Sequence, residues 1–320
     1  MEMANYMTLN DGNRIPLVAL GTSRIPDEKL EGCVKIALDM GYRHIDTAFH
    51  YGNERAIGKA LREYMENSNL KREDVYITTK LDSSYMEENA VVPALDESLR
   101  RLDLEYVDLF LIHGPCALQT LHHFPEKSPL VSEFMPVDLR ETWKGMEATV
   151  LNGKARSIGV SNFNSKQLEY ICETARIQPA VNQVEVHARF PQKKLHDFCK
   201  SRNIQLEAYC PLGSPFFKGS GLVNAIQSSD NLVEHPVIAK FAAKYRRTPG
   251  QILLRNIVQR GIVVIPKSEN PRRIKENIQI FSFSLSEEDM KKIDELDNGV
   301  RRFKLSYYDG HPDYPFHTDF

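Results

Sequence analysis

Short apolar segments alternate with longer amphipathic segments along almost the whole chain. The amphipathic segments, such as DEKLEGCVKIALDM and NERAIGKALREYM, repeat apolar residues with a helical period, whereas the apolar ones have the length of buried strands. Strands that alternate with helices are typical of a parallel sheet, and right-handed crossovers close eight such pairs into a (β/α)8 TIM-type barrel, an α/β fold. The expected strands are residues 17–22, 44–46, 75–80, 106–113, 155–161, 180–186, 205–209 and 262–266.

Four further features surround this repeating pattern. Residues 7–9 and 14–18 flank the turn sequence NDGN and predict an N-terminal hairpin. Residues 114–136 and 211–235 are too long for plain connections between a strand and a helix, and long loops at the carboxyl end of a barrel are typical of specificity loops. Residues 301–320 form an aromatic, proline-rich tail, which we expect to be ordered. No linker composition divides the chain, so we expect one domain over residues 1–320.

The composition is that of an ordinary globular protein. Apolar residues make up 42% and charged residues 26%, and the formal net charge of -2 gives no reason to expect a nucleic-acid or membrane partner. No apolar run approaches the ~18 residues that a membrane-spanning helix needs. The first residues lack the pattern of a secretory signal, and the five cysteines have neither disulfide nor zinc-site spacing. We therefore expect a cytoplasmic protein without a metal centre.

Titratable side chains stand at the ends of three successive expected strands. Asp46 ends the first and is followed by Tyr51, Lys80 ends the next, and His113 ends the third. The carboxyl ends of barrel strands converge on one face, where active sites lie. A phenol with a pKa near ~10 becomes a better acid beside an ammonium group, so we expect Lys80, oriented by Asp46, to lower the pKa of Tyr51. Each residue alone is compatible with a structural role, but the four together favour protonation of a carbonyl oxygen, with His113 binding that oxygen.

Hydride chemistry at such a site requires a cofactor, because none of these side chains can supply a hydride. A Rossmann half is not indicated: no GxGxxG follows a strand, and the GSG at 219–221 lies in a loop. The later strands instead end in Ser161, Asn162, Gln183 and Tyr209. Their amide and hydroxyl groups can bind a carboxamide, and the tyrosine ring can stack on a flat ring.

A basic helix start follows the last expected strand. Lys267 and Ser268 precede a proline that opens the helix, and Arg273 lies in its first turn. Helix N-terminal amides and a guanidinium group together suit a phosphate monoester, although a basic helix start also occurs without any ligand.

The chain resembles the aldo-keto reductase family over essentially its whole length. The motifs that carry the resemblance are LNDGNRIPLVALGT, GYRHIDTAFHYGNE, TTK, DLFLIH, IGVSNF, VNQVEVH, AYCPLGSP and IPKSENPRRIKEN, in this order. The resemblance implies reduction of aldehydes or ketones to alcohols by hydride transfer from NADPH, with Tyr51 as the general acid and Asp46, Lys80 and His113 completing a tetrad. It implies cofactor contacts at Gly21, Thr22, Ser161, Asn162, Gln183, Tyr209, Leu212, Gly213, Ser214, Lys267, Ser268, Arg273, Glu276 and Asn277.

Two small residues distinguish the expected substrate pocket. Family members often carry an aromatic residue where Ser23 stands, and very often one where Gly114 follows the histidine. Either other aromatic side chains refill this space, or the pocket accepts bulky hydrophobic ketones such as steroids, which is the outcome we expect. The residues expected to line the pocket are Ser23, His50, Gly114, Phe216, Phe303 and Tyr308.

A binding-only protein is the rival interpretation, because barrels similar to this family also serve as lens crystallins and channel-associated subunits. The tail over residues 301–320 can close over a substrate, which a binding-only relative has less need to do. We therefore expect a monomeric enzyme whose partner is a small carbonyl compound.

Overall fold

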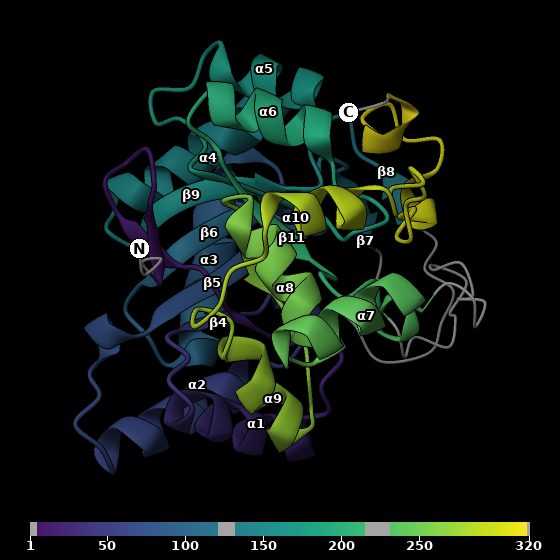
Figure 1. Ribbon diagram of the computed structural model, residues 1–320. Helices are drawn as coiled ribbons and strands as arrows, with labels where there is room; N and C mark the ends of the chain where they lie inside the picture. The colour runs from purple at the N-terminus through teal and green to yellow at the C-terminus, as the bar shows by residue number, and fades with distance from the viewer. Residues whose placement is uncertain (1–4, 121–131, 215–230, 319–320) are drawn as a thin grey trace.

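The structure is a computed structural model that describes residues 5–120, 132–214 and 231–318. Eight parallel strands form its central sheet, in the order β12-β11-β10-β9-β6-β5-β4-β3 (Figure 1). They confirm the eight strands and the barrel expected from the sequence. Their bounds are β3 (Leu20–Gly21), β4 (His44–Asp46), β5 (Tyr76–Leu81), β6 (Val107–Ile112), β9 (Ala155–Ser161), β10 (Val181–Glu185), β11 (Gln205–Tyr209) and β12 (Val263–Ile265).

The sheet closes between its first and last strands. Val18 pairs in parallel with Val264, and Gly21 with Lys267, and the Gly21 amide donates to the carbonyl of Pro266 at 3.2 Å. A Cβ on Gly21 would lie 3.0 Å from a side-chain carbon of Ile265 and 3.1 Å from its carbonyl oxygen. A residue without a side chain therefore suits this point of closure.

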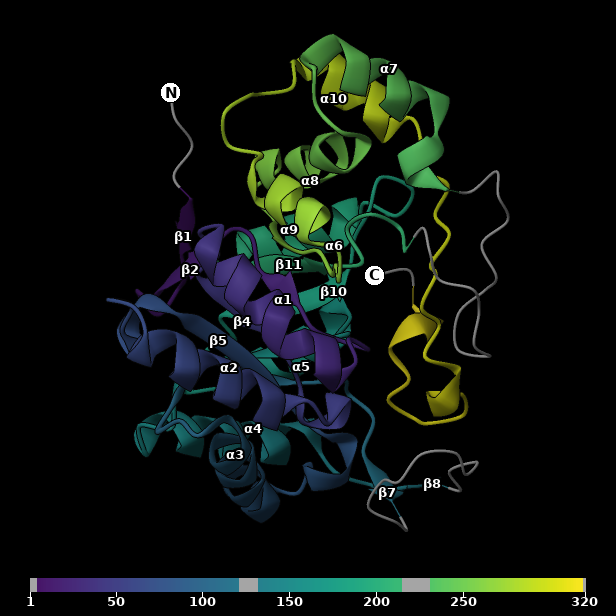
Figure 2. The same ribbon diagram turned by 90° about the horizontal axis from the view of Figure 1, so that it is seen from below.

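Helices surround the barrel, as the two views at right angles show (Figures 1 and 2). Each buries apolar side chains inside the protein; in α2, for example, Ile57 and Leu61 are at most 1% exposed. Side chains cap several of their N-termini, as Thr248 and Gln251 do reciprocally at the start of α8. The helices are α1 (Asp27–Asp39), α2 (Glu54–Glu66), α3 (Glu88–Leu102), α4 (Leu139–Leu151), α5 (Ser165–Cys172), α6 (Lys193–Ser201), α7 (Pro236–Tyr245), α8 (Pro249–Gln259), α9 (Pro271–Ile278) and α10 (Glu287–Asp294).

Two hairpins lie outside the barrel sheet. The expected N-terminal hairpin consists of β1 (Tyr6–Thr8) and β2 (Arg14–Pro16). The first long loop contains a second antiparallel pair, β7 (Leu118–Thr120) and β8 (Ser132–Phe134). Most of the second long loop, residues 215–230, lies outside the described residues.

The C-terminal tail packs across the carboxyl ends of the strands. Its 3-10 turns are η6 (Ser306–Tyr308) and η7 (Pro315–His317). The His311 ring contacts the carbonyl of Ala117 at 3.1 Å, and the Asn164 amide donates to the carbonyl of Pro315 at 3.0 Å. Figure 1 shows this yellow segment beside β7 and β8. The tail thus borders the face on which the candidate residues end.

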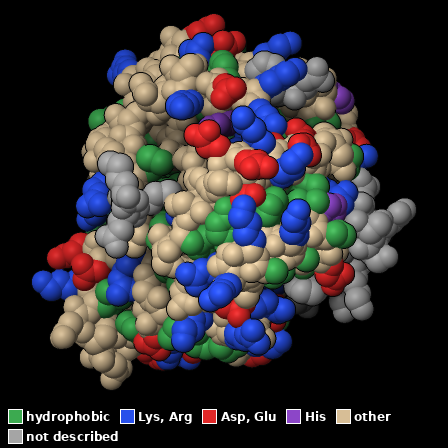
Figure 3. All heavy atoms as spheres, in the orientation of Figure 1, with side chains coloured by type: hydrophobic (Ala, Val, Ile, Leu, Met, Phe, Trp, Pro, Cys, Tyr) green, Lys and Arg blue, Asp and Glu red, His purple; other side chains and the backbone are tan. Residues whose placement is uncertain are grey.

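Basic and acidic side chains are interleaved over the face drawn in Figure 3. Among the described residues, no helix has the length and apolar character that a membrane crossing requires.

Candidate active site

Four side chains expected to act together meet at the carboxyl ends of β4, β5 and β6. Asp46 ends β4, Lys80 lies near the end of β5, and His113 directly follows β6. Tyr51 ends the 3-10 turn η1 (Phe49–Tyr51), which follows β4. The Lys80 Nζ lies 5.2 Å from the centre of the Tyr51 ring, and the Tyr51 and His113 ring centres are 5.6 Å apart.

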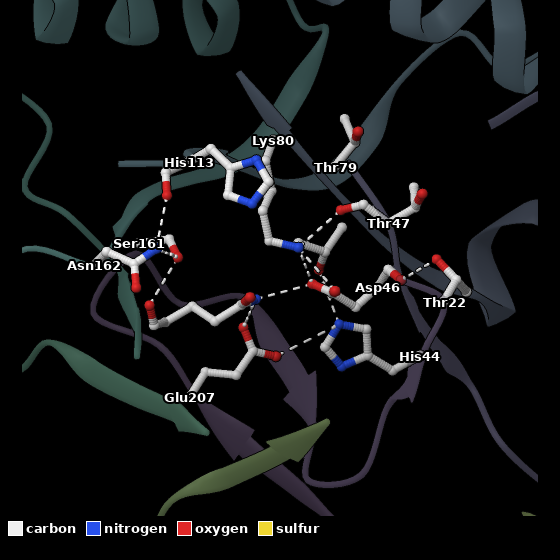
Figure 4. A network of polar contacts seen from close by, with 12 residues as sticks. Thr22, His44, Asp46, Thr47, Thr79, Lys80, His113, Ser161, Asn162 and Glu207 are labelled. Atoms are coloured by element: carbon white, nitrogen blue, oxygen red, sulfur yellow. Dashed lines mark hydrogen bonds and ion pairs between the residues drawn. The ribbon is translucent and has the colours of Figure 1, made fainter. Parts of the chain in front are cut away.

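Lys80 is a buried cation held by three acceptors. Its Nζ donates to both carboxylate oxygens of Asp46, at 2.8 and 2.7 Å, and to the carbonyl of Thr47 at 2.8 Å (Figure 4). Burial disfavours the ammonium form, but the charge of Asp46, aided by Tyr51, outweighs burial and raises the pKa of Lys80 above 10.5. The amine is therefore charged at neutral pH, and it cannot turn away from Tyr51 without losing these bonds.

The pKa of Tyr51 differs from the sequence-based expectation. Burial raises this pKa above its ordinary value of 10.0, and the Lys80 ammonium offsets only part of the rise. The expectation that Lys80 brings the pKa below the ordinary value is therefore wrong for the protein alone, because the cost of ionising a buried phenol is larger. Tyr51 consequently carries its proton throughout the physiological pH range.

His113 is neutral at the same site. Burial, and then the positive charge of Lys80, hold the pKa of His113 well below its ordinary value of 6.5. A neutral imidazole has one N–H donor and one acceptor nitrogen. It can therefore donate a hydrogen bond to a substrate oxygen without adding a second positive charge beside Lys80.

The expected carboxamide-binding residues also lie together, at the ends of β9 and β11 and in the middle of β10. The Asn162 amide nitrogen donates to the carbonyl of His113 at 2.9 Å and to the Ser161 hydroxyl at 3.1 Å, and the Tyr209 hydroxyl donates to Asn162 Oδ1 at 2.8 Å. The Ser161 hydroxyl donates to the backbone carbonyl of Gln183 at 2.8 Å. Asn162 has a left-handed backbone with φ 63°, a conformation that asparagine adopts more readily than most residues.

Gln183 joins this group to the buried Lys80–Asp46 pair. Its Nε2 donates to Asp46 Oδ2 at 2.9 Å and to Glu207 Oε2 at 3.0 Å. Among the described residues, no hydrogen bond reaches its Oε1. The amide therefore retains an acceptor that suits the NH2 of a carboxamide.

The expected phosphate-binding residues lie at the start of α9. Arg273 Nε approaches the hydroxyl of Ser268 at 3.5 Å, and Lys267 is half-exposed, with its Nζ 3.0 Å from Glu269. In the same helix, Glu276 pairs with Arg272 at 2.7 Å and Asn277 is buried. Cationic side chains and helix amides thus share one edge of the molecule.

The loop after β11 has an unusual backbone. Cys210, Gly213 and Ser214 all have positive φ, at 51°, 69° and 51°, next to the half-buried Leu212. Left-handed backbone is costly for residues other than glycine and clusters at functional sites. Successive amides in such turns can bind an anion, which suits the expected pyrophosphate contact.

Thr22 binds the backbone of Asp46. Its hydroxyl donates to the carbonyl of Asp46 at 2.8 Å, and its side chain is fully buried. Together with Gly21 at the closure of the barrel, it fixes the strand that carries Asp46.

Tyr308 occupies the space beside Gly114. A Cβ built on Gly114 would lie 3.5 Å from the Tyr308 ring and 3.7 Å from its hydroxyl oxygen, which in turn lies 2.5 Å from the hydroxyl of Ser83. Tyr308 is 4% exposed. The absent side chain at position 114 therefore does not by itself enlarge the pocket.

The remaining expected substrate residues are partly accessible. The Phe303 ring meets Tyr209 edge-on, with centres 5.8 Å apart, and Ser23 is half-buried. The His50 ring lies 6.1 Å from that of His113, and its side chain is 50% exposed. Phe216 lies outside the described residues.

Sequence reasoning missed three carboxylates in this region: Asp82, Glu185 and Glu207. Asp82 Oδ2 contacts His50 Nδ1 at 3.1 Å. Burial would raise the pKa of Asp82, but hydrogen bonds from His50 and Ser84 outweigh it and hold the value at about 2. Asp82 stands two residues after Lys80, and the two glutamates stand two residues from Gln183 and Tyr209. The twofold repeat of a strand was the signal that could have found them.

Comparisons with known proteins agree with this geometry. The model of the family described as "Aldo/keto reductase family" matches residues 17–298. Aldo-keto reductase family 1 member C15 of Rattus norvegicus is 43% identical over 322 residues, covering 99% of this chain and 98% of the relative. The solved structure of the aldose reductase from Schistosoma japonicum superposes with a TM-score of 0.91 and 38% identity, covering 99% of this chain and all of that one. The chain therefore belongs to the aldo/keto reductase family.

A second solved structure concerns the cofactor. The aldo-keto reductase of Bombyx mori in complex with NADP has a TM-score of 0.87 and 39% identity, with 98% of this chain and 99% of that one covered. This chain is accordingly an NADP-dependent oxidoreductase that reduces aldehydes or ketones to alcohols. The side chains of this site fit the cofactor: the Gln183 oxygen suits a carboxamide, and the cations at the start of α9 suit a phosphate.

Proposed function

We propose that Tyr51 is the proton donor of the carbonyl reduction, oriented and polarised by Lys80 and Asp46. The observation that carries this proposal is the buried Lys80 ammonium, which is bound by both oxygens of Asp46 while lying 5.2 Å from the centre of the Tyr51 ring. As the substrate oxygen gains charge, the phenol transfers its proton, and the nearby ammonium stabilises the phenolate that remains. His113, kept neutral, donates a hydrogen bond to the same oxygen and aligns it.

The cofactor would be held along the carboxyl ends of the later strands. When bound, NADPH supplies the hydride that adds to the carbonyl carbon. Ser161, Asn162 and Gln183 would bind its carboxamide, with Tyr209 against its ring. The loop of Leu212, Gly213 and Ser214 would bind the pyrophosphate, with Gly21 and Thr22 bordering it. Lys267, Ser268 and Arg273 would bind the 2′-phosphate, with Glu276 and Asn277 near the adenine.

For the substrate, we propose a bulky apolar carbonyl compound with a polar substituent. The tail supplies an aromatic wall, in which Tyr307 is 48% exposed and its ring centre lies 4.2 Å from that of Tyr308. A polar group also borders the site, because the half-exposed His50 is held by Asp82. A fused-ring ketone with a hydroxyl group, such as a hydroxysteroid, combines these two properties, whereas a small sugar has little apolar surface to bury.

Replacement of Tyr51 by phenylalanine tests the catalytic proposal. General acid catalysis typically contributes ~10²–10⁴-fold, so turnover in Tyr51→Phe should fall by at least that factor. Affinity for NADPH, measured by quenching of protein fluorescence, should stay within about twofold, because the hydroxyl has no part in the proposed binding of the cofactor. Near-normal turnover in this variant would refute the assignment of Tyr51.

We further propose that residues 1–320 act as one domain and as a monomer in the cytoplasm. The cysteines Cys33, Cys116, Cys172, Cys199 and Cys210 are free, which is compatible with a reducing compartment. Sedimentation equilibrium and cell fractionation test the two statements separately. A dimer, or recovery in a membrane pellet, would contradict them.

A further inference from the structure

Glu207 is a fully buried acid inside the barrel to which the reaction described above gives no task. Its side chain is 0% exposed, and it lies on β11 two residues before Tyr209. Alternate residues of a strand project from the same face, so Glu207 lies one layer below the proposed ring-stacking tyrosine. A buried carboxyl group is costly unless it is neutral or hydrogen-bonded, and its contacts therefore need an explanation.

Glu207 shares the Gln183 amide nitrogen with Asp46. The same atom, Nε2, contacts Asp46 Oδ2 at 2.9 Å and Glu207 Oε2 at 3.0 Å. Asp46 is bound by the Lys80 ammonium and is therefore a carboxylate that can only accept. The shared atom must then be the nitrogen of the amide, and its two hydrogens are both used.

Glu207 accepts the hydrogen bond from Gln183 as a neutral carboxylic acid. Its Oε2 accepts from Gln183, whereas its Oε1 has no hydrogen-bond partner among the described residues and is free to carry the proton. Burial, and then the charge of Asp46, raise the pKa of Glu207 to about 8, against the opposing effects of Gln183 and Lys80. The titratable groups around it are His44 and Asp46 on β4 and Tyr76 and Lys80 on β5.

The neighbouring histidine does not compete for the amide. His44 Nε2 lies 2.9 Å from the hydroxyl of Thr78 but 3.8 Å from Glu207 Oε1, which is beyond hydrogen-bond distance. Burial lowers the pKa of His44 to about 3, so the ring is neutral. Glu207 Oε2 thus has Gln183 as its hydrogen-bond partner among the described residues.

We propose that Glu207 is a positioning residue: with Asp46 it holds both N–H groups of the Gln183 amide, so that this amide presents its carbonyl oxygen to the carboxamide of the cofactor. Without Glu207 one N–H is released, and the amide can rotate and offer a donor in place of the acceptor. The inference rests on the proposed cofactor role of Gln183. According to this inference Glu207, which lies below the binding surface, determines whether Gln183 binds the NH2 or the oxygen of the ligand's carboxamide.

Binding of two cofactors by four proteins tests this inference. The cofactors are NADPH and its reduced 3-acetylpyridine analogue, in which a methyl group replaces the amide nitrogen. The proteins are the unmodified enzyme, Glu207→Leu, Glu207→Gln, and the control Glu147→Gln. Glu147 is a buried carboxylate on α4 that accepts from the amides of Arg176 and Ile177, at 2.6 and 2.9 Å. Dissociation constants come from fluorescence quenching, without turnover.

The expected result is a selective loss. Glu207→Leu should weaken NADPH binding by roughly two- to tenfold, the effect of one misplaced neutral hydrogen bond, and leave the analogue almost unchanged. Glu207→Gln retains an oxygen acceptor and should keep the preference for NADPH, as should Glu147→Gln. If Glu207→Leu does not fold, as judged by circular dichroism, Glu207→Met is measured against the same criterion.

Two results would overturn the inference. One is an equal change, or no change, in the affinity of Glu207→Leu for the two cofactors. The other is a Glu207→Gln protein that loses the preference as the leucine variant does. Because these are binding measurements, they remain interpretable if Tyr51→Phe proves active and the proposed proton donor is wrong.

Discussion

The ring of Tyr308 lies against the backbone of Gly114, at the distance of an ordinary van der Waals contact from any Cβ built there. The two residues are far apart in the chain but share one volume beside His113. Position 114, in the loop after β6, has no side chain, and the Tyr308 ring of the tail fills the space that such a side chain would occupy.

This relationship predicts a compensating pair of substitutions. Gly114→Phe should collide with Tyr308 and destabilise the protein by about 1–3 kcal/mol, the usual cost of overpacking. The double variant Gly114→Phe with Tyr308→Ala should recover most of that loss, since the new ring takes the vacated space. Urea denaturation of the two single variants and the double variant measures the coupling. Strictly additive effects would mean that the residues do not share this volume.

The cations at the start of α9 predict the cofactor preference. A charge-assisted hydrogen bond contributes roughly 1.5–3 kcal/mol, so NADPH should be preferred over NADH by at least about tenfold. Arg273→Ala should weaken NADPH binding and leave NADH binding almost unchanged. Arg272→Ala is the matched control, because this neighbour pairs with Glu276 and is 84% exposed. Equal loss for both cofactors in Arg273→Ala contradicts the assignment.

Glu185 anchors the tail and predicts its susceptibility to protease. Its carboxylate accepts from the amides of Arg302 and Phe303, at 2.7 and 2.8 Å, and contacts His187 at 2.9 Å. Glu185→Ala should release the tail, so trypsin should cut after Arg302 or Lys304 faster than in the unmodified protein. Glu169→Ala, which removes an exposed partner of Arg202, should change nothing. Unaltered cleavage in Glu185→Ala would show that other contacts hold the tail.

The ionisation of Glu207 predicts a dependence of stability on pH. Its pKa is raised from 4.5 to about 8 in the folded state, so the folded protein holds this proton where the unfolded chain has lost it. The stabilisation is therefore fully present below about pH 4.5, declines as pH rises, and is lost above about pH 8, with a slope of at most ~1.4 kcal/mol per pH unit. The free energy of unfolding of the unmodified protein minus that of Glu207→Gln should follow this decline. A difference that increases with pH would mean that Glu207 is ionised in the fold.

The barrel and much of the candidate site could be predicted from the sequence because both depend on local signals. Each strand is an apolar run of limited length, and Asp46, Lys80 and His113 each stand where such a run ends. Parallel strands align their carboxyl ends, so residues distant in sequence could be placed on one face before their contacts were known. The specific family motifs supplied the remaining positions that we propose for the cofactor.

Two features could not be predicted, and both depend on the balance or packing of distant groups. The direction of the Tyr51 pKa depends on how far burial outweighs Lys80, and burial is a property of the assembled barrel. Refilling of the space beside Gly114 by aromatic side chains was one of two alternatives that the sequence left open; that Tyr308 refills it depends on the path of the tail, which no periodic pattern encodes. Glu207 did have a signal, its alternation with Tyr209, but a charged residue inside a strand is more often read as facing solvent.

The anchoring of the tail has a consequence for biosynthesis. Residues 302–315 bind to the last residue of β10 and to the loops that follow β6 and β9, and they leave the ribosome after every strand of the barrel has been made. A nascent chain can therefore assemble the buried Lys80–Asp46 pair while the mouth of the site is still open to solvent. Attachment of the tail comes last, in a step that follows barrel closure and that a chaperone or a protease acting on the unattached tail could intercept.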